Sequence, residues 1–335
     1  MKFFLKHLLV PALSRPPLSN LGNWLFGQGI PIFMVHRMEV DGQPFSGITP
    51  DHLRRCLQYL VNEGFHFVSV EDIIQGIIEN KSLPPKAVAF TMDDGFWDQA
   101  EIAAPIFIEF NCPLTFFVIT GMLDSKLWPW DAKVAHLINT SEKNSIDILL
   151  ADEHFHLPLT NKQEKHNARN IIRDTIKAMA ADSIEDSLEL LVQATGISIP
   201  ESAPKHLKAM DWESARQLEK QGIKFAPHTI SHRILSKLDT ASAEKEIMDS
   251  WQCLQEELAS PSPVFCYPTG RFCDYGPREI AILKQAGFLG AVSTLPGNIT
   301  EETTSKDYLF NLPRFSLPSD YFDFVRHCTW LEQAI

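Results

Sequence analysis

The stretch AVAFTMDDG, residues 87–95, runs from an apolar segment directly into two adjacent aspartates. It follows the pair Pro84-Pro85, and a short apolar run next to such turn residues is typical of a strand buried on both faces. Two carboxylates at the end of a buried strand cost free energy unless a positive charge lies nearby. Adjacent residues of an extended backbone point apart, so Asp93 and Asp94 would have separate tasks. For the pair alone, helix N-capping is the simpler explanation.

Strands and helices alternate on both sides of this stretch. Apolar runs predict strands at residues 30–35, 65–70, 87–92, 113–119, 224–227, 264–268, 289–293 and 312–316. Amphipathic segments between them predict helices; one opens at Thr49-Pro50, a capping residue followed by a first-turn proline, and ends before Gly64. The alternation predicts an α/β fold with mainly parallel strands, and about seven such units favour a barrel.

The alternation is interrupted from about residue 124 to residue 205. Helical stretches at 161–180 and 183–194 dominate this part, with polar sequence between them. We interpret it as a helical insertion that lies beside the barrel. The chain therefore divides into an N-terminal segment, residues 1–29, and one α/β domain, residues 30–335, which contains the insertion.

Two further motifs follow predicted strands. HTISH, residues 228–232, places His228 and His232 four apart, and on one helical turn both imidazoles would reach one metal ion. With 12 histidines in the chain, a chance pair is also easy. FCYPTG, residues 265–270, joins a strand end to turn residues and would present a backbone N–H to a developing oxyanion. In a barrel the chemistry collects at the C-terminal ends of the strands, where all three motifs fall.

Composition excludes some classes of protein. A net charge of −12 argues against sequence-independent binding of nucleic acid, which needs clustered Lys and Arg. The six cysteines form no C-x-x-C pair, so we expect free thiols rather than a thiolate zinc site. Residues 1–13 are apolar but hold Lys2 and Lys6, and no small-x-small cleavage site follows. We expect a cytoplasmic protein, peripheral at the inner face of the membrane, with weak contact through residues 1–20.

The three motifs together resemble the polysaccharide deacetylase family, also called the NodB homology domain or carbohydrate esterase family 4. Their order is D-D-G, then H-x-x-x-H, then Y-P-x-G, and the resemblance covers roughly residues 30–330. The segments FMVHRM (33–38), WPWD (128–131) and LPRF (312–315) are similar to a branch of the family that has an early M-Y-H-R-V strand and a permuted motif order. The family's fold is a distorted barrel of about seven β/α units, in agreement with the strand count.

The resemblance implies a metal site and a set of catalytic roles. Asp94, His228 and His232 match the ligands of a divalent metal, with Zn²⁺ the first choice, and two imidazoles with one carboxylate suit that ion. Asp93 matches the general base, which takes a proton from the attacking water. The backbone N–H of Tyr267 would stabilise the oxyanion of the tetrahedral intermediate.

The general acid and the cation beside the base depart from the family pattern. We find no late L-x-H motif, and we assign the acid to His36, which in the permuted branch takes that place; a structural histidine at a strand end is the alternative. Cys266 stands where the family often has an arginine that tethers the base aspartate. Arg314 and Arg37 are candidates for this task, and we prefer Arg314. Three aromatic residues would supply either a sugar-binding surface or core packing: Trp128, Trp130 and Tyr275.

The sequence thus predicts a metal-dependent hydrolase that removes N-acetyl groups from an amino-sugar-containing glycan, such as a polysaccharide, a peptidoglycan fragment or a lipid-linked sugar. Three alternatives stay open: a deacylase of a non-sugar amide, a catalytically inactive glycan-binding homologue, and a non-haem iron oxygenase, because two histidines and a carboxylate also hold iron. The second aspartate fits a hydrolytic base better than it fits an oxygenase.

Overall fold

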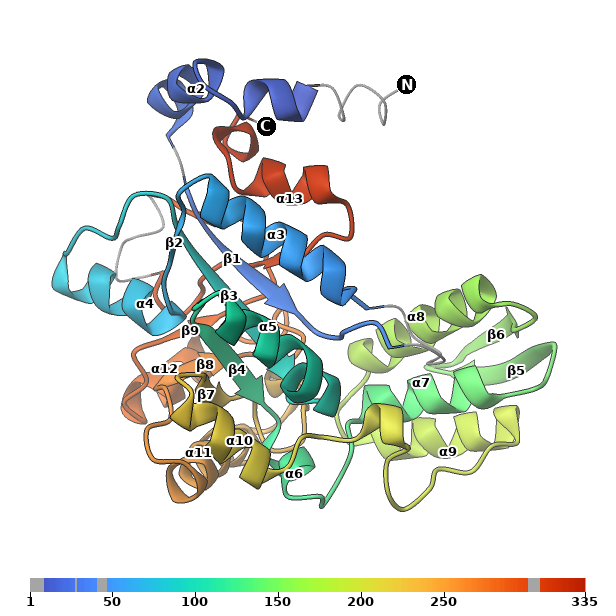
Figure 1. The fold of residues 1–335 in the computed structure, drawn as a ribbon. Coiled ribbons are helices and arrows are strands. Elements are labelled where there is room, and N and C mark those ends of the chain that lie inside the picture. The colour runs from blue at the N-terminus through green and yellow to red at the C-terminus, as the bar shows by residue number, and fades with distance from the viewer. Residues whose placement is uncertain (1–8, 28, 41–46, 301–307, 335) are drawn as a thin grey trace.

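The computed structural model describes residues 9–27, 29–40, 47–300 and 308–334. Its central strands run in parallel in the order of the chain (Figure 1). β1 (Ile30–Val35) pairs with β3 (Ala87–Asp94), β3 pairs with β4 (Leu114–Val118), and β4 pairs with β7 (Lys224–Pro227). Each of these strands consists almost entirely of buried residues, as expected for strands covered on both faces.

The remaining parallel strands bring the sheet back to β1. β8 (Val264–Cys266) pairs with β9 (Gly290–Val292), Val292 bridges to Leu312, and β11 (Phe315–Ser316) pairs with β1. Between β7 and β8 there is no ladder among the described residues, but Ser262 N donates a hydrogen bond to Phe225 O at 2.7 Å. Seven parallel strands therefore form a ring with two weak joins, between β7 and β8 and between β9 and β11, which confirms the predicted distorted (β/α)₇ barrel.

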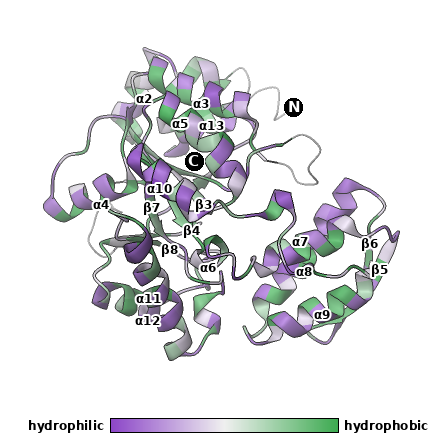
Figure 2. Cartoon of the chain, turned by 60° about the horizontal axis from the view of Figure 1, so that its bottom comes forward, coloured by the Kyte–Doolittle hydropathy of each residue, from purple (hydrophilic) through white to green (hydrophobic). Residues whose placement is uncertain are grey.

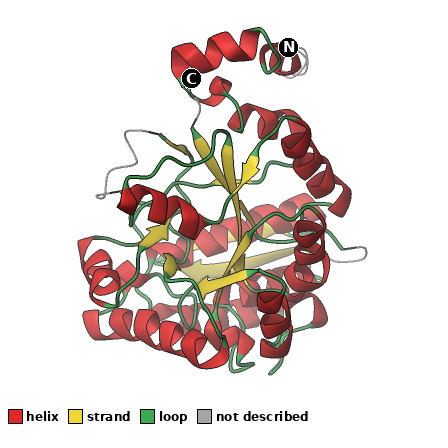
Figure 3. Ribbon diagram, turned by 60° about the vertical axis from the view of Figure 1, so that its left-hand side comes forward, coloured by secondary structure: helices red, strands yellow, loops and turns green. Residues whose placement is uncertain are grey.

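Helices surround this ring (Figure 3). The barrel helices are α3 (Pro50–Asn62), α4 (Val70–Glu79), α5 (Ala104–Glu109) after a π-helical turn (Gln99–Ala103), α6 (Thr120–Leu123), α10 (Trp212–Lys220), α11 (Thr240–Glu257), α12 (Pro277–Gln285) and α13 (Tyr321–His327). Two short strands, β2 (His66–Phe67) and β10 (Asn298–Ile299), pair with β3 and β1. No helix in the described ranges is long and apolar enough to span a membrane.

The two faces of β3 pack into different cores. Val88, Phe90 and Met92 belong to the core beneath α3 and α5, whereas Ala87 and Ala89 belong to the core that includes β8 and β9. Side chains alternate along a strand, so Asp93 points to the same side as Ala89, into the ring. Asp94 is the next residue, and the alternation separates the two carboxylates as the sequence predicted.

The insertion forms a lobe with its own core beside the ends of the strands (Figures 1 and 2). It comprises α7 (Trp130–Thr140), a hairpin of β5 (Ser145–Leu150) and β6 (Glu153–Pro158), α8 (Lys162–Ala178) and α9 (Ser183–Thr195). The sequence analysis expected helices alone here. In β5, however, Ile146, Ile148 and Leu150 are buried while the residues between them are exposed, a period of two that indicates a strand.

The N-terminal segment contains a further helix, α2 (Leu18–Phe26), which was not predicted. Gly22 lies against the Trp330 ring, and Phe26 stacks on that ring at a centroid distance of 5.4 Å. One face of α2 is thereby held against the C-terminal end of the chain, as Figure 1 shows. Residues 1–8, which belong to the predicted membrane contact, lie outside the described residues.

Candidate metal centre and active-site cleft

Asp94, His228 and His232 lie together at the C-terminal edge of the ring. Asp94 Oδ1 is 3.8 Å from His228 Nε2 and 3.7 Å from His232 Nε2, and the three ligand atoms lie within 4.8 Å of one another. These distances are too long for hydrogen bonds but suit atoms that share one cation at about 2.0–2.2 Å each. The donor set and its geometry therefore fit a divalent ion.

The backbone that carries the two histidines is a turn and not the helical turn expected from the sequence. Thr229 and His232 have left-handed φ angles of 68° and 60°, and His232 N donates to Thr229 Oγ1 at 3.0 Å. From α11, Glu246 Oε2 accepts hydrogen bonds from Ile230 N and Ser231 N at 2.9 and 3.0 Å. Glu246 was not among the predicted site residues, because nothing in its local pattern separates it from other helical glutamates.

Asp94 also has a left-handed backbone, with φ 84°. Such a conformation costs a non-glycine residue of order 1 kcal/mol and persists only where the surroundings impose it. Gln99, from the π-helical turn, supplies part of that constraint: its Oε1 accepts from Gly95 N, and its Nε2 donates to Asp93 O and His36 O at 2.5 and 2.6 Å. Gln99 thus ties the ends of β1 and β3 together, and sequence reasoning missed it.

Both imidazoles are prepared to act as neutral ligands. His228 donates its Nδ1 proton to Cys266 O at 2.8 Å, which leaves Nε2 as the free lone pair facing Asp94. Burial lowers the pKa of His228 to about 3 and also lowers the pKa of His232. The buried His232 Nδ1 has no hydrogen-bond partner among the described residues, and Asp131 Oδ1 lies 3.9 Å from it.

Asp93 forms a buried bidentate ion pair with Arg314. Arg314 Nη1 and Nη2 donate to the two carboxylate oxygens at 2.7 and 2.8 Å, and the arginine side chain is fully buried. Burial alone would raise the pKa of Asp93, but the charge and hydrogen bonds of Arg314 outweigh it and hold that pKa below its usual range. Of the two candidate arginines, Arg314 contacts Asp93, whereas Arg37 pairs with Asp98 at 2.9 Å.

Cys266 completes the surroundings of this pair. Arg314 Nη2 donates to Cys266 Sγ at 3.1 Å, and burial raises the pKa of that thiol well above its usual value. Asp93, His228 and Cys266 also lie within ligand distance of one another. A protonated thiol and a carboxylate already engaged by Arg314 are poor ligands, so the group around Asp94 is the better metal site.

His36 lies on the solvent side of Asp93, with Nε2 3.8 Å from Asp93 Oδ2. Its side chain is 47% exposed, in contrast to the buried His228 and His232. Desolvation by the protein around it lowers the pKa of His36, although the nearby Asp93 charge acts in the opposite direction. The structure thus places an accessible imidazole beside the predicted base and the predicted ligands.

Tyr267 is placed less favourably for its predicted role. Its backbone N–H already donates to Val292 O at 3.4 Å, its hydroxyl donates to Phe310 O, and its ring stacks on Tyr275 at 3.7 Å. Two residues further along the same turn, the N–H of Thr269 has no acceptor among the described residues, and its φ is left-handed at 57°. The turn therefore offers a free backbone donor at Thr269 rather than at Tyr267.

The aromatic residues proposed as a sugar-binding surface are buried. Trp128, Trp130 and Tyr275 are at most 8% exposed, and Trp130 Nε1 donates to His232 O at 3.3 Å. They pack and position the loops, which corrects the alternative of direct sugar contact. Phe272, in the loop after β8, is 80% exposed and is an accessible aromatic side chain at this end of the barrel.

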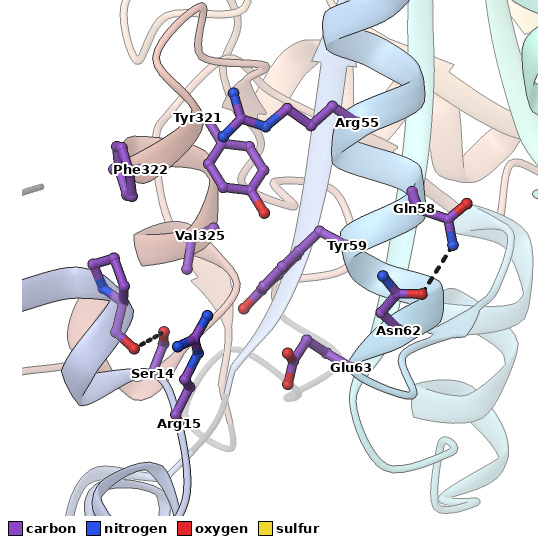
Figure 4. A pocket seen from close by; sticks show the side chains of 11 residues that line it. Ser14, Arg15, Arg55, Gln58, Tyr59, Asn62, Glu63, Tyr321, Phe322 and Val325 are labelled. Atoms are coloured by element: carbon purple, nitrogen blue, oxygen red, sulfur yellow. Dashed lines mark hydrogen bonds between the residues drawn. The ribbon is translucent and has the colours of Figure 1, made fainter.

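A cleft of about 370 Å³ opens beside the cluster, between the barrel and the insertion. His36, Asp94 and Arg37 line it from the barrel, while Asp131 and Arg173 line it from α7 and α8. A larger cavity of about 580 Å³ lies between the N-terminal residues, α3 and α13 (Figure 4). That cavity contains none of the metal-ligand candidates, so we assign the chemistry to the smaller cleft.

The barrel, the clustered carboxylates and histidines, and the cleft fit a metal-dependent enzyme. The family model for polysaccharide deacetylase matches residues 80–290, and the chain belongs to this family. Family membership makes it a hydrolase of the amide bonds of acetylated sugars, as the sequence predicted. No curated protein matches the chain.

Several solved structures share the fold. The Streptococcus pyogenes deacetylase PplD, in complex with acetate, is 18% identical, with a TM-score of 0.59 over 90% of this chain and 98% of that chain. IcaB from Ammonifex degensii is 17% identical, with a TM-score of 0.56 over 91% and 98%. A de-N-acetylase from Aggregatibacter actinomycetemcomitans is 16% identical, with a TM-score of 0.56 over 89% and 99%.

Proposed function

We propose that the chain removes N-acetyl groups from a glycan at the cleft beside Asp94, with one divalent ion, Zn²⁺ by preference, held by Asp94, His228 and His232. The convergence of these three ligand atoms within 4.8 Å of one another carries the proposal. A bound ion of this kind polarises the acetamide carbonyl and lowers the pKa of a water beside it. The remaining tasks fall to side chains of the chain itself.

Asp93 acts as the general base in this proposal. Its pKa lies below the usual range, so the carboxylate is ionised and ready to accept a proton from the attacking water. Arg314 fixes the orientation of the carboxylate through two hydrogen bonds. When water attacks the acetamide carbon, negative charge develops on the former carbonyl oxygen. That oxyanion would accept a hydrogen bond from a backbone N–H of the turn after β8, and the N–H of Thr269 has no other acceptor among the described residues.

The experiment that tests this function is acetate release. Metal-loaded protein incubated with N-acetylated oligosaccharides should release free acetate, and a chelator should stop the release. Equal rates with and without oxygen are expected of a hydrolase, whereas an oxygen requirement would favour the iron oxygenase. Release of acid from non-sugar acetamides alone would support the alternative deacylase, and binding without release would indicate an inactive homologue.

His36 is the proposed general acid, which protonates the leaving amine. It lines the cleft, so its ring can reach a substrate bound there, and its Nε2 is 3.8 Å from Asp93 Oδ2. Replacing His36 with alanine should lower kcat by about 100-fold or more, because general acid catalysis contributes about 10²–10⁴. Metal content should not change. Replacing His136, which also lines the cleft, with alanine is the control; near-normal turnover of His36→Ala would remove His36 from the mechanism.

We propose in addition that the protein is peripheral at the inner face of the membrane and makes contact through its N-terminal segment. In α2, Leu21 is 53% exposed, Trp24 79% and Leu25 56%, whereas Gly22 and Phe26 contact the Trp330 ring. An apolar helix face with a tryptophan suits the membrane interface.

Flotation with phospholipid vesicles tests this contact. The double variant Leu21→Ser/Trp24→Ser should lose most of its vesicle-bound fraction. Phe272→Ser, which removes an equally exposed aromatic side chain elsewhere, should bind like the unaltered protein. Equal flotation of the double variant and the unaltered protein would refute contact through α2.

A further inference from the structure

A row of cations runs along α8 at the wall of the cleft. Arg169, Arg173 and Lys177 are spaced four residues apart, which places them on one face of the helix. Arg169 and Arg173 line the same cleft as His36 and Asp94, and Lys177 lines the adjoining small cavity beside Trp130. All three side chains are partly buried, so water solvates their charges less fully than it solvates charges on an open surface.

These cations have few hydrogen-bond or ion-pair partners among the described residues. The Nε atoms of Arg169 and Arg173 are buried without any hydrogen-bond partner, and neither Arg173 nor Lys177 has an ion pair within the part of the chain that the structure describes. Within the described ranges, the hydrogen-bond partner of Arg169 Nη2 is the His166 ring, at 2.9 Å. A buried guanidinium nitrogen without an acceptor costs free energy, and native proteins rarely leave one without a reason.

The cations also repel one another. Burial lowers the pKa of Arg169, and the positive charge of Arg173 lowers it further. The pKa of Lys177 is lowered by the same two causes, of which burial is the larger. Two carboxylates act in the opposite direction on Lys177: Asp131, whose charge also acts on His232, and Asp174 on α8 itself. Arg37, on the opposite wall of the cleft, is already paired with Asp98. In a chain of net charge −12, the cleft wall therefore keeps an excess of positive charge.

We propose that Arg169 and Arg173 bind an anionic group, a carboxylate or a phosphate, on the glycan whose acetamide enters the metal centre. This inference rests on the proposed function and narrows it to an acidic glycan. The guanidinium fork matches both anions with two parallel hydrogen bonds. One turn of α8 separates the two arginines by about 6 Å along the helix axis, which lets both approach one anionic group.

A matched set of substrates tests the proposal. Acetate release is measured as kcat/KM for three N-acetylglucosamine compounds: a neutral dimer, a disaccharide with glucuronic acid, and the sugar 1-phosphate. At least one acidic compound should exceed the neutral dimer by about tenfold, the usual scale of a charge-assisted contact, and the one that does identifies the anion. The preference should shrink as the salt concentration rises.

Charge variants on α8 locate the effect. Arg169→Gln and Arg173→Gln should each lower the acidic-to-neutral ratio of kcat/KM about tenfold, and Arg173→Lys should recover part of it. Lys162→Gln removes one charge from the exposed start of the same helix and should leave the ratio unchanged. A ratio near one in the unaltered protein, or an equal loss on acidic and neutral substrates in both arginine variants, would overturn the proposal.

Binding separates this inference from the proposed function. If no compound releases acetate, the deacetylase function fails, and calorimetric titration of the metal-loaded protein with the glucuronic acid disaccharide still tests the anion site. Weaker binding in Arg173→Gln than in Lys162→Gln supports the site. Equal binding in these two variants overturns it.

Discussion

Replacing Asp93 with asparagine is expected to lower kcat for acetate release about 1,000-fold, because a positioned general base contributes about 10²–10⁴. The substitution keeps the shape of the side chain and one oxygen for Arg314, but it removes the group that accepts the proton. Metal content should stay at one ion per chain, since the oxygens of Asp93 are engaged by Arg314 and not by the candidate metal site.

Asp94→Asn is the matched comparison. It changes the neighbouring carboxylate in the same way, and it should lose bound metal together with activity, because Asp94 lies within ligand distance of both histidines. The pair of variants thus separates the base from the ligand. If Asp93→Asn keeps its turnover within tenfold of the unaltered protein, Asp93 is not the base; if it loses metal as Asp94→Asn does, the two tasks are assigned wrongly.

The second large effect concerns Arg314. Replacing it with methionine should lower the free energy of unfolding by about 3–5 kcal/mol and abolish acetate release, because it leaves Asp93 as an uncompensated buried charge. Chemical denaturation at neutral pH measures the loss. The double variant Asp93→Asn/Arg314→Met should regain most of the stability without regaining activity, since it removes the unpaired charge but not the need for a base.

An exposed ion pair provides the control for this prediction. Arg54 pairs with Glu109 at 3.1 Å, and both side chains are about half exposed. Arg54→Met should therefore cost about 1 kcal/mol or less, with unchanged activity. A loss in Arg314→Met no larger than that in Arg54→Met would contradict the structural importance of the buried pair.

The barrel and the composition of its site were predictable because both follow from local patterns. The apolar runs predicted the first and last residues of β1 and β7 correctly. The topology of a parallel barrel then brings the C-terminal ends of such strands to one edge. Asp93 and Asp94 end β3, and His228 directly follows β7, with His232 in the same loop. Their closeness therefore followed from strand order and needed no knowledge of other long-range contacts.

Contacts between distant segments were not predictable in the same way. Arg314 lies 221 residues from Asp93, and the sequence offered both Arg314 and Arg37 as its partner. Glu246 and Gln99 act on backbone groups of other loops, and no sequence period marks that function. The H-x-x-x-H spacing suggested a helical turn, but the left-handed φ angles of Thr229 and His232 come from tertiary hydrogen bonds.

The metal centre is tested most directly by the position of a bound ion. Crystals of the protein soaked in zinc and measured at the zinc absorption edge should show one strong anomalous peak, about 2.0–2.2 Å from an Asp94 oxygen and from the Nε2 atoms of His228 and His232. The absence of a peak at these three residues, or a peak coordinated by Asp93, His228 and Cys266 instead, would contradict the proposed site.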